Sequence, residues 1–168
     1  KYDLTWQIKD DNDFYFYERN WRLNEFFKEK GTVLDVACGS GTVGVWLQKR
    51  GFEVVGLDIS ETALNLAKRK GLSNVILQDV ERRLPFGKET FDYVFCGDIL
   101  EHLFSPARLI EEAWRVLVPG GSLIISVPNM GYWYYRLVYL TKGEVPKTEG
   151  LSAEPWNWEH IRFFTQKY

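Results

Sequence analysis

Residues 33–44 read Val-Leu-Asp-Val-Ala-Cys-Gly-Ser-Gly-Thr-Val-Gly. The first five residues predict a buried strand that carries one acid, Asp35, and the glycines predict a turn before a helix running towards Arg50. Gly39 and Gly41 can adopt positive φ and place no Cβ between the backbone and a ligand. A strand, a glycine turn and a helix in this order predict unpaired backbone N–H groups aimed at a ligand. We therefore expect a ligand site at the carboxyl end of this strand.

The same letters also match a dinucleotide-binding fingerprint. Gly39, Gly41 and Gly44 form a literal G-x-G-x-x-G, and Asp58 follows at the distance of about 20 residues that this fingerprint requires. The match alone does not decide which cofactor is bound. The position of Asp35 inside the strand and the rest of the chain must do so.

The composition predicts one globular domain. The chain has 168 residues, of which 45% are hydrophobic and 26% charged, and its net charge is -2. Lys and Arg are scattered, so no surface for nucleic acid is expected. No apolar run approaches the roughly 20 residues that cross a bilayer. The two cysteines and the lack of a signal-peptide pattern predict a cytoplasmic protein with free thiols.

Strand patterns alternate with helix patterns along most of the chain. Near-continuous apolar strands are predicted at 33–37, 53–58, 74–79, 91–96 and 123–127. This order is typical of a parallel sheet covered by helices on both faces. The helices are expected from Asp13 to Lys30, from the glycine turn to Arg50, from the Ser60 cap to Gly71 and from Ser105-Pro106 onwards. The inward face of the last one is predicted to contain Leu109, Ile110, Ala113, Trp114 and Leu117.

Residues 128–168 break this alternation and are rich in aromatic side chains. They begin with Pro128-Asn129-Met130-Gly131, continue through Tyr132-Trp133-Tyr134-Tyr135 and end near His160-Ile161-Arg162-Phe163-Phe164-Thr165.

Four blocks in order resemble the class I S-adenosylmethionine-dependent methyltransferases of the small-molecule type. They are Val33 to Gly44, Val55 to Ser60, Phe91 to Leu103 and Leu117 to Leu123, and residues 160–165 resemble a later segment of the family. The resemblance implies an α/β fold, a Rossmann-like three-layer αβα sandwich with a mainly parallel sheet. The chain as given ends before the two strands of the family's final hairpin, which we expect to be missing from it. Ala37 stands where the family usually has glycine, and we expect this change to have a slight effect.

We expect one S-adenosylmethionine-binding domain over residues 1–168. Residues 1–30 would form a helical cover, residues 31–127 the cofactor-binding core and residues 128–168 an aromatic cover for the substrate.

The resemblance implies S-adenosyl-L-methionine as cofactor and S-adenosyl-L-homocysteine as product. Asp58 would accept hydrogen bonds from both ribose hydroxyls, Asp79 would accept one from the adenine amino group, and the Val80 N–H would donate to the adenine ring. Asp35 would organise the glycine turn near the methionine ammonium. The alternative roles are a helix-entry acid for Asp58 and a turn acid for Asp79. The cofactor-binding residues implied are Asp35, Ala37, Cys38, Gly39, Gly41, Asp58, Ile59, Asp79, Val80, Cys96 and Gly97.

A pyrophosphate fits this set poorly, because Asp35 would place a negative charge beside it and no basic residue is aimed at it. An NAD-linked oxidoreductase therefore remains only the alternative reading, as does a domain that binds the cofactor without catalysis. No metal site is expected, since Cys38 and Cys96 with two histidines elsewhere offer poor metal chemistry.

Methyl transfer from a sulfonium is an in-line displacement in which alignment can supply most of the acceleration. A base is needed only if the acceptor must lose a proton. The candidates are His102, beside Glu101, and His160, beside Glu159, although each could instead have a packing role. Aromatic residues would enclose a small acceptor, apolar or aromatic, or else form core or a homodimer interface. The substrate-binding candidates are Tyr132, Trp156 and Trp158, with Trp133 and Tyr135 as neighbours.

Overall fold

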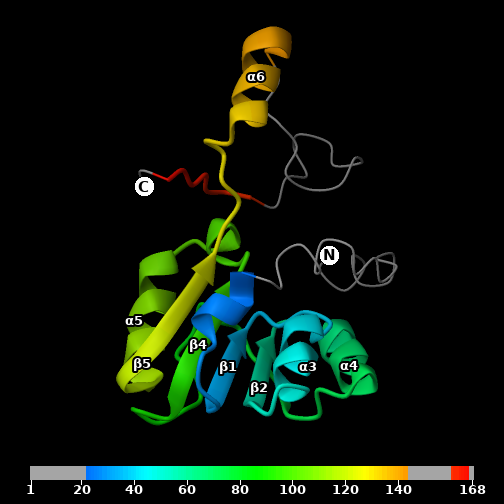
Figure 1. Cartoon of the computed structure of the whole chain (residues 1–168), viewed down its shortest axis with the longest axis vertical. Coiled ribbons are helices and arrows are strands. Elements are labelled where there is room, and N and C mark those ends of the chain that lie inside the picture. The colour runs from blue at the N-terminus through cyan, green and yellow to red at the C-terminus, as the bar shows by residue number, and fades with distance from the viewer. Residues whose placement is uncertain (1–21, 144–159, 167–168) are drawn as a thin grey trace.

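A five-stranded parallel sheet forms the centre of the computed structural model, which describes residues 22–143 and 160–166 (Figure 1). The strand order is β3-β2-β1-β4-β5, and every neighbouring pair is parallel. The strands are β1 (Thr32–Val36), β2 (Glu53–Asp58), β3 (Val75–Leu77), β4 (Phe91–Gly97) and β5 (Leu117–Ser126). The α/β fold with a parallel sheet is therefore confirmed.

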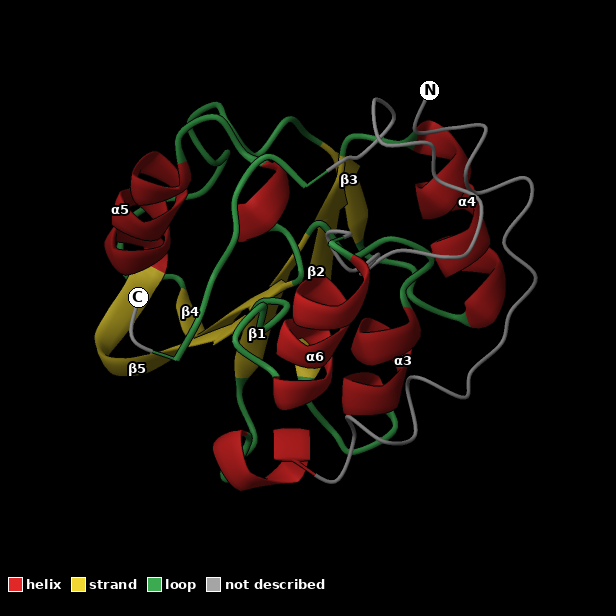
Figure 2. Cartoon of the chain, turned by 90° about the horizontal axis from the view of Figure 1, so that it is seen from above, coloured by secondary structure: helices red, strands yellow, loops and turns green. Residues whose placement is uncertain are grey.

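Helices cover both faces of the sheet. Figure 2 shows α5 (Pro106–Val116) on one side and α3 (Thr42–Gln48) and α4 (Glu61–Lys70) on the other. A short 3₁₀ helix, η1 (Leu100–His102), follows β4, and α6 (Trp133–Lys142) follows β5 and projects away from the sheet (Figure 1). The three layers are those expected of an αβα sandwich.

The side chains of β1 show how one strand supplies both cores. Leu34 and Val36 pack with α5, whereas Val33 packs with α3 and α4. Successive side chains of a strand point to opposite faces, so a strand covered by helices on both sides is apolar at nearly every position. Asp35 is the exception, and it is only 2% exposed.

The helix predicted from Asp13 to Lys30 ends earlier than expected. Residues 1–21 lie outside the described part of the chain, and residues 22–26 are helical. The Tyr93 hydroxyl donates to the Glu29 carbonyl oxygen at 3.0 Å and accepts from the Glu29 N–H at 3.3 Å. Because this tertiary contact occupies both main-chain groups of Glu29, Gly31 is not the helix terminator. Leu23 and Phe27 do pack on the sheet, as expected of a covering helix.

Two predictions for α5 are wrong. Trp114 is 62% exposed, because the buried face consists of Leu109, Ala113 and Val116, and Trp114 lies about 100° around the helix from Ala113. Leu117 begins β5 rather than ending the helix, since it pairs with Phe91. The register then shifts, so that Ser122 is the partner of Tyr93. The Ser60 cap and the Gly71 end of α4 are confirmed.

A salt bridge on α5 holds the connection between β3 and β4. Arg115 donates from Nη2 to Glu112 Oε2 at 2.6 Å and from Nη1 to the Phe86 carbonyl oxygen at 2.8 Å. Glu112 accepts in turn from the Leu84 N–H at 2.8 Å. The hydrogen bond from Arg115 is the main cause that lowers the pKa of Glu112.

We expect Arg115→Ala to lower the free energy of unfolding by about 2 kcal/mol at neutral pH, because charge-assisted hydrogen bonds are lost. A carboxyl whose pKa is lowered on folding stabilises the fold above its unfolded value and loses this effect as the pH falls. The variant should therefore lose less stability than the wild type between about pH 5 and pH 3. Urea unfolding over this range measures both effects. Arg108→Ala, exposed on the same helix, should match the wild type, and an equal acid dependence in Arg115→Ala would contradict the assignment.

Among the described residues, no helix is both long enough and apolar enough to cross a membrane.

Candidate functional site

Three carboxylates follow the edge at which β1, β2 and β3 end. Asp58 is the last residue of β2 and pairs with Leu77, the last residue of β3. Asp35 lies one residue before the end of β1, and Asp79 lies two residues beyond β3. Because these strands are adjacent and parallel, the three acids lie along a single margin of the sheet.

Asp58 holds the glycine turn in place. Its Oδ2 accepts from the Gly39 N–H at 2.8 Å, and its Oδ1 accepts from the Ser60 N–H at 2.8 Å. The residue is 8% exposed. The alternative role as a helix-entry acid is thus part of its function. Each carboxylate oxygen can accept more than one hydrogen bond, so this role leaves capacity for a ligand hydroxyl.

The backbone of the turn is bonded within the protein. The Cys38 N–H donates to the Leu57 carbonyl oxygen at 2.8 Å, and the Gly41 N–H donates to the Cys38 carbonyl oxygen at 2.9 Å. Together with the Gly39 N–H, these are three donors that we expected to face a ligand, and for them the expectation is wrong. Ala37, Gly39 and Gly41 have φ of 57°, 54° and 75°, which folds the turn back onto the sheet. A turn of this kind is poorly suited to hold a pyrophosphate.

Charges of both signs lie beside the glycine turn. The Lys70 ammonium donates to Ser40 Oγ at 3.0 Å and to Thr42 Oγ1 at 3.2 Å, so the expectation that no basic residue is aimed at the turn is wrong.

The carboxylates Asp35 and Asp58 lie near the two cysteines. Burial, followed by the charges of Asp35 and Asp58, raises the pKa of the Cys38 thiol well above its usual value. Burial and then the charge of Asp35 raise the pKa of the Cys96 thiol to about 12. Both cysteines are free thiols, as expected. Negative charge near Asp35 and Asp58 favours a ligand group that carries positive charge.

Strand β4 brings the other predicted cofactor residues beside β1. Cys96 pairs with Val36, and Gly97 is the last residue of β4 and pairs with Ser126. The Asp98 N–H donates to the Ser126 carbonyl oxygen at 2.9 Å, which continues the pairing beyond the strand. Cys96 and Gly97 therefore lie at the same margin as Asp35.

The residues after β2 and β3 are divided between core and surface. Asp79 Oδ1 accepts from the Glu81 N–H at 2.9 Å, and Oδ2 forms an ion pair with Arg82 at 3.4 Å. These are the contacts of a turn acid, so the role of Asp79 towards adenine stays a prediction. Val80 is buried at 8% exposure, whereas Ile59 is 56% exposed beside Asp58. Ile59 thus presents an apolar surface next to Asp58.

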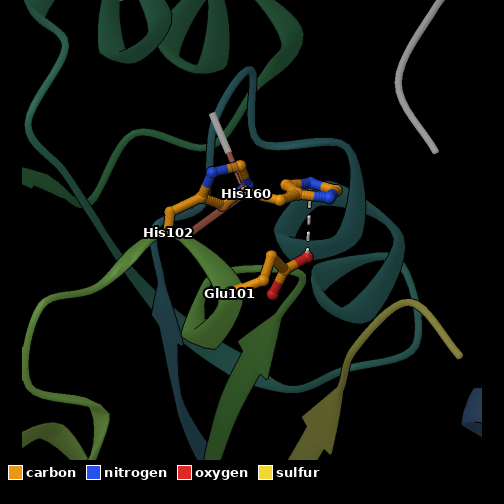
Figure 3. A group of neighbouring side chains, drawn as sticks. All are labelled: Glu101, His102 and His160. Atoms are coloured by element: carbon orange, nitrogen blue, oxygen red, sulfur yellow. Dashed lines mark ion pairs between the residues drawn. The ribbon is translucent and has the colours of Figure 1, made fainter. Parts of the chain in front are cut away.

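The two histidines, distant in sequence, meet beside a buried carboxylate (Figure 3). The rings of His102 and His160 are 4.7 Å apart and lie edge to face. His160 Nε2 is 3.9 Å from Glu101 Oε1, and Glu101 is 1% exposed. One carboxylate oxygen of Glu101 and one ring nitrogen of each histidine lie within 4.8 Å of one another. The sequence suggested each histidine separately and paired His160 with Glu159, which lies outside the described residues.

Residues 160–166, here called the C-terminal strap, produce this meeting. The N–H groups of Ile161 and Arg162 donate to the Glu101 carbonyl oxygen at 2.9 and 3.1 Å. Arg162 Nε donates to the Leu103 carbonyl oxygen at 3.0 Å. Farther along the strap, the Met130 N–H donates to the Phe164 carbonyl oxygen at 2.8 Å. The sequence places Glu101 with His102 just past the fourth strand, but Glu101 was not selected as a catalytic candidate, and nothing in the sequence indicates that it lies beside His160.

The aromatic residues before the strap are largely exposed. Tyr132 is 48% and Trp133 64% exposed, and no residue of α6 is buried. Trp156 and Trp158 lie outside the described residues. Their predicted role in covering a substrate therefore stays a prediction.

Comparison with known proteins identifies the family of the chain. A family model described as "Methyltransferase domain" matches residues 34–125. The chain is 34% identical to the ubiquinone biosynthesis O-methyltransferase of Hydrogenovibrio crunogenus over 122 residues, which are 70% of this chain and 51% of that protein. A solved S-adenosylmethionine-dependent methyltransferase from Aquifex aeolicus superposes with a TM-score of 0.60 at 31% identity, covering 71% of this chain and 68% of that one. The PH0226 protein of Pyrococcus horikoshii has a TM-score of 0.67 at 32% identity, with 82% and 64% covered.

The fold and the carboxylate-lined margin define a Rossmann-like protein of the class I S-adenosylmethionine-dependent methyltransferases. The chain belongs to the methyltransferase domain family. It spans about half the length of the curated relatives that it matches.

Proposed function

We propose that the protein containing this chain transfers a methyl group from S-adenosylmethionine to a small-molecule acceptor. The observation that carries the proposal is the negative margin formed by Asp35 and Asp58 beside the glycine turn. The sulfonium and the ammonium of the cofactor are cations, and such a margin stabilises them. Asp35 and Asp58 would repel the pyrophosphate of a dinucleotide, which disfavours an oxidoreductase even with Lys70 bound to Ser40 and Thr42.

Each predicted residue has a role that its position supports. Asp58 would accept from the ribose hydroxyls, and Ile59 would cover the adenine with apolar surface. The Val80 N–H would donate to the adenine ring, with Asp79 beside it. Asp35, with the backbone near Gly39 and Gly97, would surround the amino-acid tail. When bound, the cofactor supplies an activated methyl group, and the chain has to align the acceptor with it.

The acceptor is proposed to be small and to be methylated on oxygen. The Hydrogenovibrio crunogenus relative is named an O-methyltransferase of ubiquinone biosynthesis. Aromatic side chains would cover such an acceptor: Tyr132 and, outside the described residues, Trp156 and Trp158. The alternative is that the exposed α6 pairs with a second copy of the chain. We also propose that the protein is located in the cytoplasm, because two free thiols suit a reducing compartment.

Ligand binding to the purified protein tests the proposal. At 100 times its dissociation constant, S-adenosylhomocysteine should add about 2.7 kcal/mol of stability, which raises the melting temperature by roughly 5–10 °C for a domain of this size. NAD⁺ at the same concentration should leave the melting temperature unchanged. A shift with NAD⁺ alone would support the oxidoreductase instead. Cofactor binding without transfer to any member of a phenol and alcohol panel would indicate a non-catalytic domain.

A further inference from the structure

We propose that His160 and Glu101 form the proton-accepting pair of the methyl transfer, so that the acceptor is one that must lose a proton, an alcohol or a phenol. This inference rests on the proposed function and deepens it. His160 is the base, while Glu101 and His102 are positioning residues. The C-terminal strap completes the site.

The burial of Glu101 is the first step of the argument. A carboxylate at 1% exposure has lost most of its hydration, and it is stabilised by a cation close to it. His160 Nε2 lies 3.9 Å from this carboxylate, and the His160 side chain is 8% exposed. The imidazole becomes that cation when it takes a proton. Proton transfer to His160 is therefore favoured by an ion pair that forms as the transfer proceeds.

The surroundings of the pair hold it in one geometry. Glu101 belongs to η1, which begins three residues after the end of β4. Its carbonyl oxygen accepts from the N–H groups of Ile161 and Arg162 in the C-terminal strap. The Arg162 guanidinium is bound to the carbonyl oxygens of Leu103 and Phe104 rather than to the Glu101 carboxylate. His102 packs its ring at 69° against His160 and limits its rotation (Figure 3). At 3.9 Å, Glu101 acts on His160 through charge rather than through a hydrogen bond, and the neighbouring ring of His102 restricts its orientation.

The reaction balances with these groups. The acceptor O–H bond breaks, and its proton goes to the imidazole of His160, beside the Glu101 carboxylate. The oxygen electron pair forms a bond to the methyl carbon as the carbon–sulfur bond breaks. The electron pair of the broken carbon–sulfur bond stays on sulfur, which leaves the neutral thioether of S-adenosylhomocysteine and a methyl ether. The proton on His160 returns to solvent.

Acceptors of different acidity distinguish this role from a structural one. The full-length protein is assayed with two phenols of similar size, one neutral at the assay pH and a nitrophenol that is already ionised. We expect His160→Gln to lower kcat on the neutral phenol by at least about 100-fold, the usual contribution of a general base. On the ionised phenol, which needs no base, the loss should stay within about 5-fold, and S-adenosylhomocysteine affinity should not change. Glu101→Gln should show the same selectivity with a smaller loss.

Controls and contrary outcomes are available for each role. Arg108→Ala, exposed on α5, should match the wild type on both phenols. If Glu101→Gln does not fold, His160→Gly with added imidazole replaces it, and recovery on the neutral phenol alone supports the inference. Equal losses on both phenols would overturn it. Loss of activity with a chelator and recovery with a divalent cation would also overturn it, because the three side chains would then be metal ligands. Failure of the wild type to bind S-adenosylhomocysteine would contradict the proposed function itself.

Discussion

Replacing Asp58 with alanine is expected to lower the affinity for S-adenosylhomocysteine by at least about 100-fold. The side chain would accept from both ribose hydroxyls, and hydrogen bonds to a charged group contribute about 1.5–3 kcal/mol each. A loss of about 3 kcal/mol corresponds to roughly two decades in the dissociation constant. Isothermal titration calorimetry of the wild type and the variant measures this difference.

The same replacement should also destabilise the free protein. Gly39 and Ser60 would lose their acceptor in a buried setting, and we expect the free energy of unfolding to fall by about 2–3 kcal/mol. Urea unfolding without ligand separates this effect from binding, provided that the titration is run where the variant is folded. The two readouts together test whether one carboxylate serves both the turn and the ligand.

Two other acids provide matched controls for Asp58→Ala. Asp79→Ala removes one accepting carboxylate at the partly exposed end of the margin, so affinity should fall by only about 10-fold and stability by less than about 1 kcal/mol. Glu61→Ala changes an exposed acid in the first turn of α4 and should leave binding unchanged. An Asp58→Ala protein that binds as tightly as the wild type would refute the assignment of Asp58 to the ribose.

The margin of acids could be predicted because its determinants are local. Each of the three acids lies within, at the end of, or just beyond an apolar strand, and adjacent parallel strands end at the same edge. The Ser60 cap and the Gly71 end of α4 are equally local, since capping depends on residues within one turn. These are the parts of the fold that the order of residues specifies directly.

Long-range contacts could not be predicted in this way. Nothing near Glu29 indicates that Tyr93 takes both of its main-chain groups, and nothing near His102 indicates that His160 packs against it. These contacts depend on how segments distant in sequence meet at the sheet.

Ala37 shows a related limit of local pattern. The family usually has glycine at this position, and alanine here adopts φ of 57°. For a residue with a side chain, this left-handed conformation costs about 1–2 kcal/mol. The surrounding turn holds Ala37 in this conformation against that cost. The positive φ of Ala37 could be recognised only from the backbone of the structure.

Gly41→Ala is expected to be the most destabilising single-methyl change in the turn. Gly41 precedes α3 with φ of 75°, where a side chain is strained. A Cβ at this position would lie 2.8 Å from the Cβ and 3.1 Å from the Cα of Ala67 in α4. Because the closest atoms belong to a short side chain and a backbone, neither can move aside cheaply. We expect the free energy of unfolding to fall by about 3 kcal/mol, combining backbone strain and overpacking.

The packing part of this loss can be separated from the backbone part. Gly71→Ala places a methyl group at φ of 109° with nothing within 4 Å of the new Cβ, so it should show strain without overpacking. The double variant Gly41→Ala/Ala67→Gly removes the facing methyl group and should be more stable than the sum of the single losses, with a coupling of about 1 kcal/mol. Strict additivity would mean that α3 and α4 do not meet closely at Gly41. In that case the glycine would be required only for its backbone conformation.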